Sequence, residues 1–301
     1  MNLAPVVLFV YNRLTHTRLT VEALQKNILA NQSDLIIFSD APKVEKQYEA
    51  VSKVREYLHQ IDGFKSVTIV ERPINFGLAN SIIDGVTSVV NQYGRVIVLE
   101  DDLVTSPYFL QFMNNGLNVY EKNEDVASIH GYVYPIDDLP ETFFLMGADC
   151  WGWATWKDKW AMFEPNGTNL LEKLKRENLM KRFDFNGAYS YSKMLTDQIV
   201  GNNNSWAVRW HASAFLNNKY TLYPGKSLVL NIGNDGSGTH CGETSAFSSQ
   251  LSNKAIEVNT VPVEDNQQAF QAIERYFRKQ KVGFMARFLQ LVARTYRKVV
   301  K

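Results

Sequence analysis

The chain has 301 residues, of which 45% are hydrophobic and 21% are charged, and its formal net charge is +1. This composition is typical of a globular protein with a large core, and it excludes a disordered chain, a collagen-like repeat and a coiled coil. Near-neutrality also argues against a nucleic-acid partner. The sequence has only 2 cysteines and its N-terminus lacks the features of a signal peptide, so we expect a cytoplasmic protein.

Apolar runs and helical spacing alternate over the first hundred residues. The expected strands are 6–10, 35–38, 67–70 and 96–99, and the expected helices between them are 15–28, 47–58 and 78–90. Strands that alternate with helices across short links predict a parallel sheet with right-handed crossovers. Because ligands of such sheets bind beyond the carboxyl ends of the strands, the polar residues that follow each run are candidate site residues.

The pattern changes in the second half of the chain. The expected elements are a helix at 107–120, a fifth strand at 126–129, helical segments at 170–183 and 189–200, a glycine-rich loop at 231–242, an irregular stretch at 243–264 and a basic helix from about 266. Aromatic residues crowd between Trp151 and Phe163. No internal repeat or low-complexity linker is evident.

Three carboxylates, Glu100, Asp101 and Asp102, follow directly after the fourth apolar run. Unpaired carboxylates are costly inside a sheet, so we expect them at its edge. There they can bind a hard cation such as Mg²⁺ or Mn²⁺ together with a diphosphate. The alternative is a solvated acidic turn, but the position after a buried strand favours the cation.

These residues resemble the nucleotide-sugar-dependent glycosyltransferases of the GT-A fold. Glu100–Asp102 is similar to their DXD metal motif, in the EDD form of the N-acetylglucosaminyltransferase I-like family. Asn12 and Arg13, after the first strand, resemble that family's nucleotide-contacting pair. The resemblance implies a Rossmann-like, mostly parallel central sheet flanked by helices. It also implies a nucleotide-sugar-binding half (1–105), an acceptor-binding half (106–264) and a basic helical tail (265–301).

Further donor contacts come from the same resemblance. Asp40 matches the acidic residue that contacts the uridine, and Asn75 and Gly77 lie in a segment similar to one of the related family 2 enzymes. Glu100 and Asp101 are assigned to the donor, whereas Asp102 is assigned to the metal. Each has a structural alternative: Arg13 could form a surface salt bridge, Asp40 an Asx turn, and Gly77 a helix-initiating turn.

An inverting reaction needs a general base within hydrogen-bond reach of the acceptor hydroxyl. Asp197 resembles the family's base in order and distance along the chain, and Asp149 is its rival, with Asp197 preferred. Either could be an ordinary helix or turn residue. Trp151 and Trp153 are expected to include an acceptor platform, with Trp153 preferred, although tryptophans belong in the core by default. His240 is a candidate metal ligand, or an ordinary loop histidine.

The charge is divided unevenly along the chain. Residues 275–301 hold 9 basic and no acidic side chains, interleaved with apolar ones, so the rest of the chain has a net charge of −8. A basic amphipathic helix is typical of binding to an anionic membrane surface, and the alternative is a terminal helix that caps the core. If it binds membrane, we expect a peripheral protein on the inner face.

With these residues, the resemblance implies a metal-dependent, inverting glycosyltransferase that uses Mn²⁺ or Mg²⁺. It would transfer a hexosyl or N-acetylhexosaminyl group from a nucleotide diphosphate donor, with UDP preferred, to a glycan or lipid-linked saccharide in cell-surface polysaccharide synthesis. One alternative is a nucleotidyltransferase that makes a nucleotide sugar, but the segment after the first strand has no glycine. The other is a non-catalytic glycan-binding protein, which the intact Glu100–Asp102 set disfavours.

Overall fold

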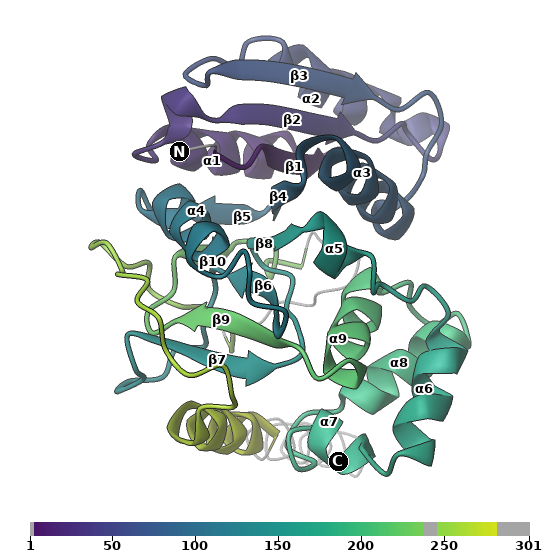
Figure 1. Cartoon of the computed structure of the whole chain (residues 1–301). Helices are drawn as coiled ribbons and strands as arrows, with labels where there is room; N and C mark the ends of the chain where they lie inside the picture. Colours follow the sequence, from purple (N-terminus) through teal and green to yellow (C-terminus); the bar gives the residue numbers. More distant parts are fainter. Residues whose placement is uncertain (1–2, 237–245, 282–301) are drawn as a thin grey trace, which may run out of the picture.

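The computed structural model describes residues 3–236 and 246–281 (Figure 1). Its strands are β1 (Val6–Val10), β2 (Asp34–Ser39), β3 (Ser66–Glu71), β4 (Arg95–Glu100), β5 (Leu103–Thr105), β6 (Val126–His130), β7 (Thr142–Met146), β8 (Trp153–Trp156), β9 (Tyr220–Pro224) and β10 (Val229–Asn231). Its α-helices are α1 (Leu14–Gln25), α2 (Tyr48–Leu58), α3 (Leu78–Tyr93), α4 (Phe109–Val119), α5 (Lys157–Trp160), α6 (Gly167–Arg176), α7 (Met180–Phe183), α8 (Tyr191–Ile199) and α9 (Trp206–Leu216). Two 3₁₀ turns (Ala30–Gln32 and Glu45–Gln47) and a helix over 267–281 complete the elements.

The central sheet has eight strands in the order β3-β2-β1-β4-β8-β6-β9-β7, and β5 pairs with β10 in a separate two-stranded sheet. The first four strands are parallel, as the alternating pattern predicted. β8 runs antiparallel to both β4 and β6, β9 is parallel to β6, and β7 is an antiparallel edge strand. The predicted mostly parallel sheet flanked by helices is confirmed. The short strands β5, β7, β8, β9 and β10 were not expected from the sequence.

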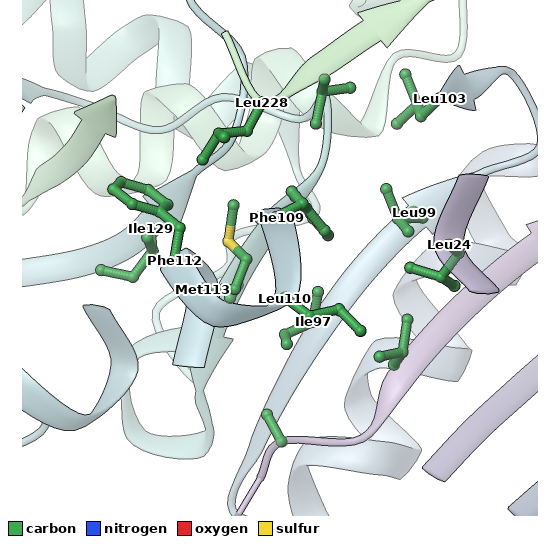
Figure 2. Close-up of a cluster of buried hydrophobic side chains, with 14 of the residues drawn as sticks. Leu24, Ile97, Leu99, Leu103, Phe109, Leu110, Phe112, Met113, Ile129 and Leu228 are labelled. Atoms are coloured by element: carbon green, nitrogen blue, oxygen red, sulfur yellow. The ribbon is translucent and has the colours of Figure 1, made fainter. Parts of the chain in front are cut away.

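Helices cover both faces of β1, β2 and β4 because these strands are apolar on both sides, whereas the edge strand β3 is only partly buried. On one face, buried residues of α1, α2 and α4 pack against alternate strand residues such as Leu8 and Ile97. Figure 2 shows part of this cluster, where Leu110 and Met113 of α4 lie close to Ile97. On the other face, α3, α5 and α9 pack against residues such as Phe9 and Val98. Gly85 of α3 permits this contact, since a Cβ there would come within 2.8 Å of the Phe9 ring.

A third core lies beyond β6, where α6–α9 pack with β7 and β9. The helix over 267–281 belongs to this core through Ala269, Phe270, Ile273 and Phe277, and Phe277 is only 3% exposed. The start of the predicted tail therefore caps the core, while Arg275, Arg278, Lys279 and Lys281 face outward. Residues 282–301 lie outside the described part. Within that part, no helix is both long and apolar enough to cross a bilayer.

Candidate active site

One edge of the sheet collects the polar residues that the sequence singled out. The register pairs Phe9 of β1 with Glu100 of β4, so the carboxyl ends of these parallel strands lie side by side. β8 begins at the same edge, because Trp153 pairs with both Val98 and His130. The segment that precedes β8 therefore reaches the end of β4, although about fifty residues separate the two along the chain.

Arg13 lies between the end of β1 and the carboxylates that follow β4. Its Nη2 atom donates to Asp102 Oδ2 at 2.8 Å and also to Asp101 Oδ1. Burial lowers the pKa of the guanidinium and the two carboxylates raise it, with a net pKa above the ordinary value. Arg13 thus stays charged and orients both carboxylates. The salt bridge that was the structural alternative for Arg13 is therefore present, and its partners are two of the three carboxylates of the predicted motif.

The three carboxyl groups repel one another. Burial, then the charges of Asp102 and Asp101, raise the pKa of Glu100 to about 8. Burial also raises the pKa of Asp101 to about 6, although Arg13 opposes this rise. Three acidic groups therefore share a single guanidinium, and a second cation would be favourable at this edge.

Asp102 is held by the segment that follows β10. The Ile232 N–H donates to the Asp102 carbonyl at 2.9 Å, and Gly233 packs against the Asp102 carboxylate. A Cβ at Gly233 would lie 2.1 Å from Oδ2, so only glycine leaves the carboxylate in place. Two residues further, Asp235 pairs with His16 of α1 at 3.2 Å. Sequence reasoning missed Gly233, whose only signal was its place in the glycine-rich loop.

The donor set at this edge suits a hard cation. Asp102 supplies carboxylate oxygen, its side chain is 16% exposed, and Mg²⁺ or Mn²⁺ commonly binds one or two carboxylates plus substrate phosphates. Over residues 3–236 and 246–281, no set of three or more His, Cys, Asp or Glu side chains is placed to hold a metal alone. A cation at Asp102 would need further ligands from outside this set. The predicted ligand His240 lies outside the described residues.

Asp40, Asn75 and Gly77 come together beyond β2 and β3. The Asp40 carboxylate is 6% exposed and accepts hydrogen bonds from the N–H groups of Ala41, Phe76 and Gly77 and from Asn75 Nδ2, at 2.8–3.1 Å. Gly77 has φ +70°, a left-handed conformation that favours glycine. Asp40 thus shapes the loop that leads into α3. Asn12 is part-buried and lies just after the carboxyl end of β1.

Asp149 lies in an aromatic cluster at the same edge. The hydroxyl of Tyr223, near the end of β9, donates to Asp149 Oδ2 at 2.8 Å. The neighbouring Trp151 packs edge-on against Tyr132 at 4.7 Å between ring centroids. The backbone N–H of Trp151 donates to His130 Nε2 at 3.1 Å. Burial, then the charge of Asp149, raises the pKa of Tyr223 well above its ordinary value. Sequence reasoning missed Tyr223, which carries no motif.

Asp197 has a different setting, on α8. Lys193 Nζ donates to its carboxylate at 2.6 Å, one helical turn away, and this hydrogen bond lowers the Asp197 pKa. α8 packs on α6 and α9, and Figure 1 shows this group of helices (lower right) well apart from β1–β3 (top). The segment that contains Asp149 leads into β8 at the strand edge, whereas Asp197 lies on α8, and the role of either as the base stays a prediction.

The position of Trp153 corrects the expectation of an exposed acceptor platform at this residue. It was preferred as the exposed acceptor platform, but it is 0% exposed and lies among Trp160, Trp206 and Trp210 in the core. Side chains alternate across a strand, so Trp153 of β8 points into the face that α3 and α9 cover. Trp151, which precedes the strand, remains part-buried at the edge.

Comparisons with known proteins give partial similarities only. No family model and no curated protein matches the chain. Among solved structures, the chain is similar to the mannosyltransferase PcManGT from Pyrobaculum calidifontis in complex with GDP-Man and Mn²⁺ (14% identity, 44% of this chain and 38% of that chain covered, TM-score 0.30). It is also similar to residues 1–349 of TarS from S. aureus (9% identity, 75% and 59% covered, TM-score 0.38). The chain therefore spans less than two thirds of the length of each of these two solved structures.

Proposed function

We propose that the protein is a metal-dependent, inverting glycosyltransferase that transfers a sugar from a nucleotide diphosphate, preferably a UDP-sugar, to a saccharide hydroxyl. The observation that carries the proposal is the Arg13–Asp101–Asp102 cluster at the adjoining ends of β1 and β4, with Asp149 presented from the neighbouring β8. This arrangement offers a cation-binding carboxylate, a fixed positive charge and a separate candidate base at one edge. The acceptor is proposed to be a glycan or lipid-linked saccharide of a cell-surface polysaccharide.

Each group has a role in this reaction. Arg13 is positioned to donate to the diphosphate, and Asn12, Asp40, Asn75, Gly77, Glu100 and Asp101 form the proposed donor side. Asp102 would hold Mn²⁺ or Mg²⁺, which stabilises negative charge on a departing diphosphate. Asp149 takes the proton of the acceptor hydroxyl while that oxygen attacks the anomeric carbon, and the bond from this carbon to the diphosphate oxygen breaks. Tyr223 holds Asp149 in place through its 2.8 Å hydrogen bond.

Calorimetry with UDP and Mn²⁺ tests the donor side. Asp102→Ala should abolish metal-dependent UDP binding, because the proposal gives this carboxylate to the metal. Asp197→Ala, which removes an exposed carboxylate from α8, should leave UDP binding unchanged. Wild-type UDP affinity in Asp102→Ala would refute the assignment. A hydrolysis assay across several nucleotide sugars then identifies the donor, and the absence of any hydrolysis or transfer would refute the enzyme.

Paired substitutions test the base. Asp149→Asn keeps the size of the side chain and its contact with Tyr223 but removes the proton acceptor, so transfer should fall by about 10²–10⁴-fold with donor binding retained. Asp197→Asn is the matched control, because Asp197 makes only local contacts with Lys193 and Asn202. Transfer that survives in Asp149→Asn and fails in Asp197→Asn would return the role to Asp197.

We further propose that the basic C-terminal segment binds an anionic membrane surface. The support is the outward position of Arg275, Lys279 and Lys281 on a helix whose apolar side is already occupied by the core. Binding through this helix would therefore be electrostatic and weakened by salt. Co-sedimentation with vesicles that contain phosphatidylserine tests this, and equal binding to neutral vesicles at high salt would contradict it.

A further inference from the structure

The surface around Asp149 has an unusual chemistry for a site with a carboxylate. The Asp149 charge acts on Tyr134, Tyr191 and Tyr223, and partly buried aromatic rings lie in the same region: Tyr134, Trp151, Tyr189 and Phe247. They contact one another: Tyr134 and Phe247 have centroids 6.2 Å apart, and Trp151 and Phe247 are 5.9 Å apart and edge-on. The surface therefore presents ring faces and edges beside a single carboxylate.

The polar groups beneath these rings are neutral. Burial, the largest effect, lowers the pKa of His130 to about 4 and also lowers the pKa of His211. Burial followed by the Asp149 charge raises the pKa of Tyr191 well above its ordinary value, and burial also raises that of Tyr134. At neutral pH the imidazoles are therefore uncharged, and the tyrosine hydroxyls keep their protons.

Several carboxylates of the chain are paired with a lysine or arginine. Asp101 and Asp102 pair with Arg13, Asp197 with Lys193, and Asp265 with Arg182. In the described ranges, Asp149 pairs with no lysine or arginine and is held by the neutral Tyr223 hydroxyl. Among the described residues, the acidic group of this cluster is the Asp149 carboxyl.

We infer that the saccharide unit that receives the new bond is an uncharged pyranose, bound over the Trp151 ring and against the perpendicular Phe247 ring, beside Asp149. Aromatic faces suit the apolar C–H face of a neutral sugar, and protonated tyrosine hydroxyls suit its hydroxyl groups. A uronate or phosphate-bearing unit would instead meet the Asp149 charge and no cation within the described cluster. This inference rests on the proposed glycosyl transfer and assigns the chemical class of its acceptor.

Matched sugars that differ in one charge provide the test. The binding of methyl glucoside and methyl galactoside is compared with that of the corresponding methyl glucuronide and galacturonide, by ligand-observed NMR on the full chain with UDP and Mn²⁺. We expect a neutral member to bind at least tenfold more tightly than its uronate. Equal or tighter binding of the uronates, or the absence of binding by every sugar, would overturn the inference.

Variants locate the binding and separate the two proposals. Trp151→Ala should weaken the neutral sugar about tenfold, whereas Tyr93→Ala, which removes a 42% exposed aromatic at the far end of α3, should not. Equal effects would overturn the location. UDP binding is measured in the same samples. If UDP binds and the uronates are preferred, only the acceptor inference fails. If the wild-type protein does not bind UDP, the proposed transferase itself is refuted.

Discussion

Substitution of Gly233 by alanine tests how the carboxylate edge is held together. The new Cβ would stand 2.1 Å from Asp102 Oδ2, so the carboxylate must retreat by about 1.3 Å to reach ordinary contact at 3.4 Å. That retreat moves Oδ2 away from the position at which it accepts the 2.8 Å hydrogen bond from Arg13. A hydrogen bond between charged groups contributes about 1.5–3 kcal/mol, which corresponds to roughly a 10–150-fold change in affinity.

The expected result is a loss of at least about tenfold in Mn²⁺-dependent UDP affinity by calorimetry. Gly236→Ala is the control, because that glycine lies three residues further with φ +82° and has nothing within 4 Å of its Cβ position. It adds backbone strain to the same segment without touching Asp102. Wild-type affinity in Gly233→Ala, or an equal loss in Gly236→Ala, would refute the reasoning.

Two further predictions concern stability. His130 has its pKa lowered from 6.5 to about 4, so the unfolded chain takes up the proton first as the pH falls, and unfolding at pH 5 should cost about 2 kcal/mol less than at pH 7 from this group. His130→Gln, whose side chain can still accept from the backbone N–H of Trp151, should reduce this pH dependence of the unfolding free energy in urea titrations. Trp153→Ala should cost about 3–5 kcal/mol of unfolding free energy, whereas Trp151→Ala should cost clearly less and chiefly reduce transfer. Similar losses of stability in both variants would contradict the difference in burial.

β1, β2 and β4 could be predicted because each is a continuous apolar run that is buried on both faces, and β3 because its apolar residues follow the same spacing at the sheet edge. β5 and β8 could not, since they have three and four residues, too few for a periodic pattern. The carboxyl-end location of Glu100–Asp102 followed from the same runs. The choice between Asp149 and Asp197 did not follow, because chain distance is uninformative where an antiparallel strand returns the chain to an earlier edge. Trp153 was misplaced for the same reason, since its side is decided by β8.

β8 also has a mechanical consequence. It hydrogen-bonds to β4 on one side and to β6 on the other, so the region of Arg13 and the region of Asp149 belong to one continuous ladder. Two lobes joined by a flexible linker could close over their substrates by hinge bending, but this sheet cannot bend at β8 without losing backbone hydrogen bonds in its interior. Movement during a reaction cycle must therefore come from the loops at the edge, and the spacing between the Arg13 side and the Asp149 side is built into the strand register.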